Sequence, residues 1–147
     1  MAQNETIKVF LADRYSHFRD NVKTSFKKKQ IEISGEADTA EDLLDALESQ
    51  KPDLLITAHR LHDESADYFL PIIKTKYPEL KILLLTLNCH KKVFLKYVDY
   101  LDGMVCKLAH KEDVIDAIID ITRKDKLYFR IDRHARESKD QRQNKLR

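Results

Sequence analysis

The chain has 147 residues, 42% of them hydrophobic, which suits one domain with a single core and is short for two. Lys and Arg number 27 against 25 Asp and Glu, so the overall balance indicates neither a nucleic-acid-binding nor a membrane-surface protein. The N-terminus is polar and no apolar run approaches the ~18 residues of a membrane span, so we expect a cytoplasmic protein with reduced cysteines.

The first half of the chain alternates between patterns typical of strands and of helices. Residues 7–12 are an apolar run of strand formers, and residues 14–29 carry apolar side chains four positions apart, the helical period. Residues 31–37 alternate like a strand. A helix is then predicted to begin at its cap Thr39 and to end before Pro52.

The second half repeats this alternation three times. Residues 53–58 are a continuous apolar run, as expected for a strand covered on both faces. A polar loop follows, and then a helix that Pro78 ends. The remaining elements are predicted as a strand over 81–87, a helix over 90–100, a short strand over 103–106 and a helix over 110–125.

Five strands that alternate with five helices predict an α/β fold with parallel strands and right-handed crossovers. We expect a flavodoxin-like, doubly wound five-stranded sheet in the order 2-1-3-4-5, with helices on both faces. This domain takes residues 1–128. Residues 129–147 are predicted to be a basic tail or helix extension, with seven basic and three acidic residues between Arg130 and Arg147.

In sheets of this kind the functional crevice lies beyond the carboxyl ends of the strands. This rule selects a small set of residues without reference to any family. They are Asp13 and Arg14 after the first strand, Ala58, His59 and Arg60 after the third, Thr86 after the fourth and Lys107 after the fifth.

Six segments in order resemble the receiver domain of bacterial response regulators, especially of the subclass with a LuxR-type DNA-binding domain. They are IKVFLADRYSHFRDNV, ISGEADTAEDLLDAL, KPDLLITAHRL, YPELKILLLTL, DGMVCK and HKEDVIDAI. The resemblance covers roughly residues 7–125 and implies the receiver fold. In the LuxR-like subclass a helix-turn-helix domain would follow, and no such segment comes after residue 125 in this chain.

The resemblance also implies where a phosphorylation site would lie. The family has two acidic residues after the first strand, an acceptor aspartate at the end of the third, a hydroxyl at the end of the fourth and a lysine after the fifth. Here Arg14 takes the second acidic position, Ala58 the acceptor position and Met104 the aromatic switch position. We therefore expect a degenerate site formed by Asp13, Arg14, Ala58, Arg60, Thr86 and Lys107.

The residue types of this site do not suit receiver chemistry. An acyl phosphate needs a carboxylate nucleophile, and Mg²⁺ needs carboxylate and carbonyl oxygens. Ala58 has neither, and Asp13, Arg14 and Lys107 together carry a charge of about +1. At an effective dielectric of about 20, this charge repels a dication about 5 Å away by roughly 6 to 7 kcal/mol. We expect no metal and no cofactor here.

Two interpretations remain open for each of the charged and polar residues of the crevice. The Arg14 guanidinium either takes the place of the metal and pairs with Asp13, or points to solvent. Thr86 and Lys107 either bind an anion, or persist because Thr86 caps a strand end and Lys107 pairs with Asp13.

Other residues carry weaker signals. His59 and His62 lie three apart and could ligate zinc, but no third ligand has a recognisable spacing. Asp63 lies near the site in sequence and could be a displaced acceptor. Cys106 is predicted to be an inert buried thiol, and Cys89 a more exposed one that could take part in redox chemistry.

Two functions of different classes are consistent with these features, and no pattern indicates an enzyme. The first is a phosphorylation-independent signalling module that binds another signalling protein, or itself as a homodimer, through a face built by helix 4, strand 5 and helix 5. The second is a transcription-associated regulator that contacts DNA through its basic tail or through a partner. Residues expected on the partner face, or else in the core, are Tyr97, Tyr100, Leu101 and Met104.

Overall fold

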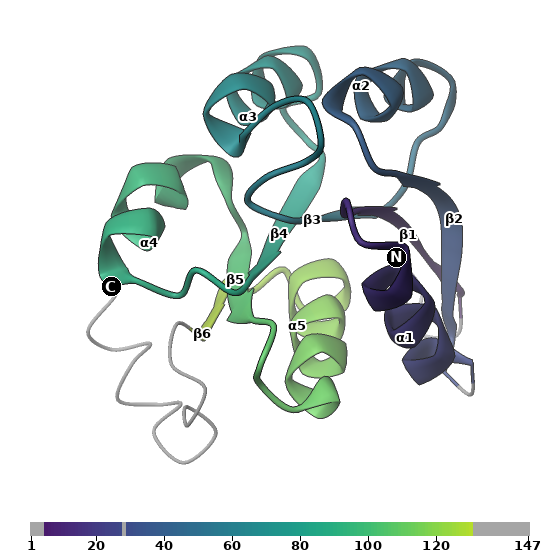
Figure 1. The fold of residues 1–147 in the computed structure, drawn as a ribbon. Coiled ribbons are helices and arrows are strands. Elements are labelled where there is room, and N and C mark those ends of the chain that lie inside the picture. The colour runs from purple at the N-terminus through teal and green to yellow at the C-terminus, as the bar shows by residue number, and fades with distance from the viewer. Residues whose placement is uncertain (1–4, 28, 131–147) are drawn as a thin grey trace.

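The sheet contains six parallel strands in the order β2-β1-β3-β4-β5-β6 (Figure 1). The computed structural model describes residues 5–27 and 29–130. The expected order of the first five strands is confirmed, and a sixth strand is added beside β5. The strands are β1 (Ile7–Ala12), β2 (Ile31–Ala37), β3 (Leu54–Thr57), β4 (Lys81–Thr86), β5 (Gly103–Cys106) and β6 (Tyr128–Arg130).

The helices cover both faces of the sheet, α1 and α5 on one face and α2, α3 and α4 on the other (Figure 1). The Thr39 hydroxyl accepts a hydrogen bond from the Asp42 backbone N–H at 3.1 Å, as the predicted helix cap requires. No helix in the described ranges is both long and apolar enough to cross a membrane. The helices are α1 (Ser16–Phe26), α2 (Ala40–Ser49), α3 (Ala66–Lys76), α4 (Lys91–Tyr97) and α5 (Lys111–Arg123), with a 3₁₀ turn η1 (Val98–Tyr100) after α4.

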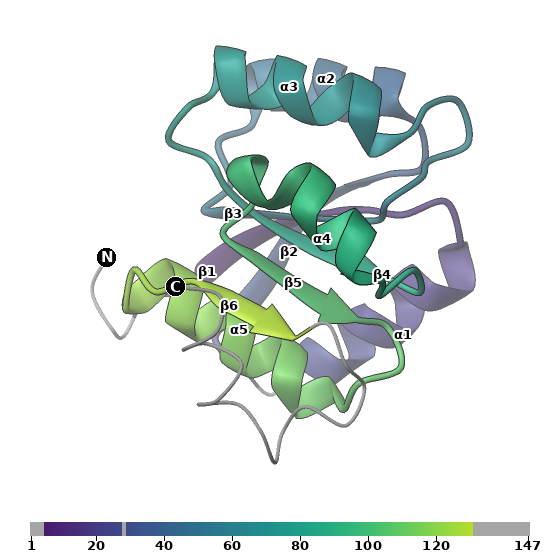
Figure 2. The same ribbon diagram turned by 90° about the vertical axis from the view of Figure 1, so that its left-hand side faces the viewer.

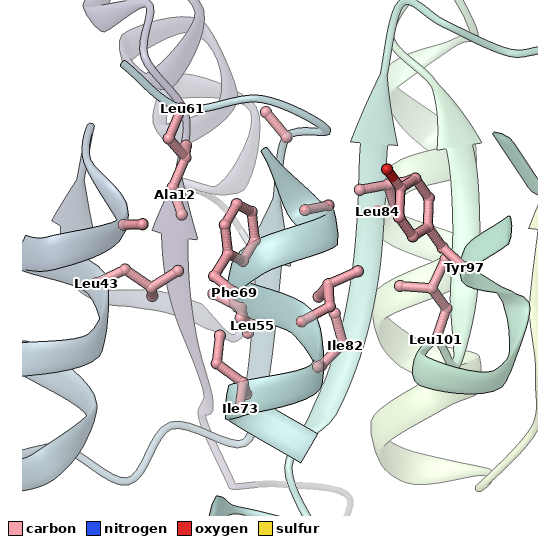
Figure 3. Close-up of a cluster of buried hydrophobic side chains, with 14 of the residues drawn as sticks. Ala12, Leu43, Leu55, Leu61, Phe69, Ile73, Ile82, Leu84, Tyr97 and Leu101 are labelled. Atoms are coloured by element: carbon pink, nitrogen blue, oxygen red, sulfur yellow. The ribbon is translucent and has the colours of Figure 1, made fainter. Parts of the chain in front are cut away.

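Two apolar clusters, one on each face of the sheet, form the core. The four residues of β3 are all buried, because helices cover this central strand from both sides. Phe69 and Ile73 of α3 lie over Leu55 of β3 and Ile82 of β4 (Figure 3). Alternate strand residues therefore face opposite clusters, and the polar strand ends are left at the edge of the sheet.

The sixth strand extends the sheet beyond the expected domain boundary at residue 128. Tyr128, Phe129 and Arg130 are buried and pair with β5, so the sheet takes two residues that were assigned to the tail. In Figure 2, β6 lies beside β5, between α4 and α5. Gly103 permits this pairing, because a Cβ there would lie only 2.5 Å from the Tyr128 carbonyl oxygen. The remainder of the predicted tail, residues 131–147, lies outside the described residues.

Candidate functional site at the carboxyl edge of the sheet

The residues selected from the sequence do meet at one edge. Strands β1, β3, β4 and β5 are neighbours and parallel, so their carboxyl ends lie side by side. The Ala58 N–H donates to the Ala12 carbonyl at 2.9 Å, and the Lys107 N–H donates to the Thr86 carbonyl at 2.9 Å. These bonds continue the strand pairing just beyond the strand ends and hold the crevice backbone in place.

Asp13 and Lys107 form a buried ion pair in the centre of the crevice. The Lys107 Nζ lies 2.6 Å from Asp13 Oδ2, and the two side chains are 8% and 2% exposed. The Tyr15 N–H donates to Asp13 Oδ1 at 2.9 Å. The Lys107 ammonium also lies 4.1 Å from the centre of the Phe18 ring, which adds a cation–π contact. Lys107 was expected either to bind an anion or to pair with Asp13, and in the structure it pairs with Asp13.

Arg14 does not pair with Asp13, which corrects the first of its two expected roles. Its guanidinium carbon lies 4.7 Å from the centre of the Tyr15 ring, and the side chain is half-buried. The reason is that Lys107 reaches Asp13 from β5, across the crevice, and already takes the carboxylate. Arg14 thus leaves an additional positive charge at the rim.

Ala58 presents only a methyl group at the end of β3 and is 6% exposed. The Thr86 hydroxyl accepts a hydrogen bond from the Asn88 N–H at 3.0 Å, so it caps the β4–α4 loop as one interpretation predicted. Arg60 is exposed, and its backbone bridges to Ser65. The crevice therefore contains a neutralised Asp13–Lys107 pair, the methyl group of Ala58, and a Thr86 hydroxyl that already accepts a hydrogen bond.

A chain of hydrogen bonds that the sequence did not indicate links the residue after Ala58 to α3 and α4. His59 Nε2 lies 3.1 Å from the Tyr97 hydroxyl, which donates to Asp67 Oδ1 at 2.9 Å. Because that hydroxyl has one proton and gives it to Asp67, the imidazole must donate from Nε2. Lys96 Nζ donates to Asp67 Oδ2 at 2.9 Å, and this bond, more than the bond from Tyr97, holds the pKa of Asp67 below its usual range.

Burial sets the proton affinity of two members of this chain. Desolvation lowers the pKa of His59, and the nearby Asp67 carboxylate opposes the change without cancelling it. Desolvation also raises the pKa of Tyr97, and its hydrogen bond to Asp67 raises it further. Both rings are therefore held in their neutral forms near pH 7.

Three of the four residues expected on a partner face or in the core are in the core, and Tyr100 is half-buried beside it. Tyr97, Leu101 and Met104 are 1%, 6% and 0% exposed, and Tyr100 packs against the same cluster. Figure 3 shows Tyr97 and Leu101 in this cluster. Their apolar side chains point inward because α4 lies on the sheet through this face. The hydrogen-bonding edge of β5 is taken by β6 as well, so a partner on this side would meet β6 rather than β5.

The two cysteines are joined in a disulfide, whereas the sequence interpretation had both reduced. Cys89 is half-buried and Cys106 is 5% exposed, which is the expected order of exposure. A signal for the pairing was present in the sequence. Cys106 ends the predicted fifth strand and Cys89 follows the fourth, its neighbour in the sheet, so both lie at the same edge.

Two weaker candidates have structural roles. Asp63 accepts hydrogen bonds from the Ala40 and Glu41 N–H groups at 2.7 and 3.2 Å, at the start of α2. Desolvation opposes ionisation of Asp63, but these bonds outweigh it and lower its pKa. His62 Nε2 lies 4.0 Å from Asp38, and no group of three metal-ligating side chains occurs within the described ranges.

Comparison with known proteins gives one family and one fold. A family model described as the response regulator receiver domain matches residues 9–119. No curated protein matches the chain. Among solved structures, the isolated receiver domain of RcsB from Salmonella enterica serovar Typhimurium, with the phosphomimetic BeF3-, is similar at 21% identity and a TM-score of 0.78, over 86% of this chain and 94% of that one.

Two further RcsB structures have the same likeness. The non-phosphorylated receiver domain of the stress response regulator RcsB from Escherichia coli is 21% identical with a TM-score of 0.79, over 86% of this chain and 99% of that one. A structure of two RcsB dimers bound to two parallel DNAs is 21% identical with a TM-score of 0.79, over 86% of this chain. The match spans 65% of that longer RcsB chain.

Proposed function

Because the chain belongs to the response regulator receiver domain family, we propose that it is a member that signals without phosphorylation, through contact with another protein. The observation that carries this proposal is the state of the crevice. A methyl group from Ala58 stands at the end of β3, and the Asp13 carboxylate is neutralised by Lys107 at 2.6 Å. Such a crevice offers no free carboxylate to attack a phosphodonor.

The charges around the crevice support the same proposal. The Asp13–Lys107 pair is neutral, and Arg14 beside it adds a positive charge. A dication entering this space would meet net repulsion and would have to displace Lys107 from Asp13. We therefore infer that neither Mg²⁺ nor any other cofactor belongs to the resting protein, and that its role is regulatory rather than enzymatic.

The test is labelling by a small phosphodonor, acetyl phosphate, with Mg²⁺ present and mass spectrometry as the readout. We expect no phosphoryl group on the wild-type protein. Ala58→Asp alone is expected to remain unlabelled, because Arg14 and Lys107 still oppose the metal. The double variant Ala58→Asp with Arg14→Asp sets three carboxylates against Lys107, a net charge of about −2 that a dication balances, so it is expected to be labelled.

A matched control is the double variant Ala58→Asn with Arg14→Asp. Asparagine has nearly the size of aspartate and no nucleophilic carboxylate, so this protein is expected to stay unlabelled. Labelling of the wild-type protein on an aspartate of the crevice would overturn the proposal. Labelling of Ala58→Asp as readily as of the double variant would overturn the account of Arg14.

We place the contact surface on the side of the molecule that carries α4 and β6. Leu95 of α4 and Leu127, just before β6, are exposed apolar residues there, at 58% and 56%. The partner is another signalling protein or a second copy of this chain, in the cytoplasm. Sedimentation of the wild-type protein and of Leu95→Asp tests self-association, and an equal fraction of dimer in both proteins would exclude Leu95 from a dimer contact.

The second candidate is a transcription-associated role. It is favoured by the seven basic residues between Arg130 and Arg147, which act on DNA directly or beside a DNA-binding partner. A titration with duplex DNA at several salt concentrations separates the two functions. Phosphate contacts make affinity fall steeply with salt, whereas a protein-binding module gives no such binding.

A further inference from the structure

The disulfide lies at the edge of the sheet that holds the crevice. Cys89 belongs to the β4–α4 loop and Cys106 is the last residue of β5, with their Cα atoms 5.7 Å apart. Cys106 pairs in register with Thr86 and is buried, so neighbouring backbone fixes its position. Cys89 is half-buried in a loop and is the sulfur that a reagent from solvent reaches first.

Each cysteine is followed directly by a residue that matters to the crevice or to α4. Lys107, after Cys106, is the partner of Asp13. His90, after Cys89, is the N-cap of α4, and this helix carries Tyr97, whose hydroxyl reaches His59. A single covalent bond therefore ties the strand end that holds the buried lysine to the beginning of α4.

We propose that Cys89 and Cys106 form a reversible dithiol–disulfide site whose redox state sets the position of the β4–α4 loop and of α4. The chemistry and the loop movement depend on the two cysteines alone. Only the use of this change as a signal rests on the proposed phosphorylation-independent function.

The reaction is a thiol–disulfide exchange with a low-molecular-weight thiol or a dithiol. The thiolate attacks Cys89 Sγ, the Cys89–Cys106 bond breaks, and Cys106 leaves as a thiolate that takes up a proton. A second thiol then attacks the mixed disulfide and releases Cys89, which is also protonated. The two external thiols are oxidised to one disulfide, and their two electrons and two protons are transferred to the protein cysteines. A small disulfide reverses the reaction.

Reduction releases the loop rather than the strand. Cys106 stays in place through the pairing of β5 with β4 and β6, whereas the loop has few other ties. The other hydrogen bonds of Asn88 and Cys89 are local: the Asn88 N–H donates to the Thr86 hydroxyl, the Cys89 N–H donates to the Leu87 carbonyl, and Cys89 Sγ lies 3.2 Å from the Thr86 carbonyl oxygen. We therefore expect the movement at Cys89 and at the first turn of α4.

The experiment uses the full chain, purified without reductant. We expect no thiol to react with N-ethylmaleimide before reduction, two to react after dithiothreitol, and none again after oxidised glutathione. Hydrogen exchange measured by mass spectrometry is expected to be faster after reduction in peptides covering residues 87–97, by about 10-fold or more in a segment that opens locally. Peptides from β1 and β3 are expected to stay unchanged.

Two variants complete the test. Cys89→Ser is expected to exchange fast with or without dithiothreitol, and Cys106→Ser serves as a second variant without the bond. Leu87→Ser alters an exposed residue of the same loop and keeps both sulfurs, so it is expected to respond to dithiothreitol like the wild type.

Three results would overturn the proposal. One is a pair of thiols that oxidised glutathione does not join. Another is a disulfide that dithiothreitol reduces only after the protein is unfolded, since that bond would be a permanent staple. The third is equal exchange of residues 87–97 in both redox states. Phosphorylation of the wild-type protein would overturn the proposed function and leave this redox site standing.

Discussion

Lys107 combines three contacts at the residue scale. Its ammonium pairs with Asp13 at 2.6 Å, lies 4.1 Å from the centre of the Phe18 ring and is 5.5 Å from the centre of the Tyr15 ring. A buried charge is tolerated only when its partners replace the water it has lost. Asp13 and Lys107 therefore satisfy each other's charge, while Arg14 remains as a further positive charge at the rim.

Removing one member of the buried pair is expected to be costly. Lys107→Met leaves the Asp13 carboxylate buried without its cation, which typically lowers the free energy of unfolding by about 3 to 5 kcal/mol. The double variant Asp13→Asn with Lys107→Met leaves no buried charge and is expected to be more stable than Lys107→Met alone. Urea denaturation gives the free energy of unfolding of the wild type, of Lys107→Met and of the double variant.

The control for this prediction is Lys96→Met, which removes an ion pair whose lysine is 57% exposed. Exposed pairs contribute below about 1 kcal/mol, so a small loss is expected. If Lys107→Met lowered the free energy of unfolding no more than Lys96→Met, the buried Asp13–Lys107 pair would not stabilise the fold as proposed.

His59 is expected to make stability depend on pH. Burial holds its pKa below the ordinary value of 6.5, so the unfolded chain takes up a proton at a higher pH than the folded protein does. The contribution of neutral His59 to the free energy of unfolding is complete above pH 6.5. It is lost as the pH falls through 6.5 toward the lower pKa of His59 in the folded state. Melting temperatures at pH 7.5 and 5.5 are expected to differ more for the wild type than for His59→Gln.

Glutamine suits this comparison because its amide N–H reaches about as far as the imidazole Nε2 and can still donate to the Tyr97 hydroxyl, but does not titrate. The carboxylates with lowered pKa values, Glu36, Asp63, Asp67 and Asp125, remain ionised through this pH range and do not confuse the result. An equal pH dependence in the two proteins would argue against a buried neutral imidazole.

At the scale of elements, β6 is the principal difference between the expected and the observed architecture. It takes the outer edge of β5, and its Phe129 ring packs edge-on against Phe94 of α4 with ring centres 5.1 Å apart. Three consecutive buried residues thus anchor the segment that follows α5. The strand is too short, and too close to charged residues, for a pattern of alternation to reveal it.

Two shortened chains are expected to distinguish the contribution of β6 to stability from that of the segment after it. A chain ending at Lys126 loses the buried Tyr128 and Phe129, and the removal of large buried aromatic side chains costs about 3 kcal/mol or more. A chain ending at Arg133 keeps β6 and loses a segment of polar composition, so its melting temperature is expected to stay within a few degrees of the wild type. Equal melting temperatures for the two shortened chains would contradict the packing of β6.

At the scale of the whole molecule, the two faces of the sheet differ in what they leave exposed. The cluster under α2, α3 and α4 receives Tyr97, Leu101 and Met104, so the side of the molecule expected to bind a partner is filled from within. Exposed apolar residues on this side include Leu95 of α4 and Leu127 in the segment before β6. A partner on this side would meet Leu95 and Leu127 rather than the buried Tyr97, Leu101 and Met104.

The sequence determined the parts of this protein that depend on short-range patterns. Apolar runs and helical periods placed five strands and five helices, and the rule for parallel sheets then placed Asp13, Ala58, Thr86 and Lys107 at one edge. The assignment of Ala58 to the acceptor position comes from the resemblance to receiver domains, and the sequence shows that its side chain is a methyl group, which cannot become a nucleophile.

The tertiary structure decided every feature that depends on which of several neighbours a side chain meets. Asp13 could have paired with Arg14 or with Lys107. In the fold, Lys107 just after β5 reaches across the crevice and pairs with Asp13. Tyr97 could have faced a partner or the core, and the packing of α4 on the sheet turned it inward, where its hydroxyl found His59 and Asp67. Cys89 and Cys106 are 17 residues apart in the chain; the predicted strand order puts both at one edge, and the fold brings their Cα atoms to 5.7 Å, close enough for a disulfide. These choices depend on distances set by the whole fold, which local sequence patterns do not contain.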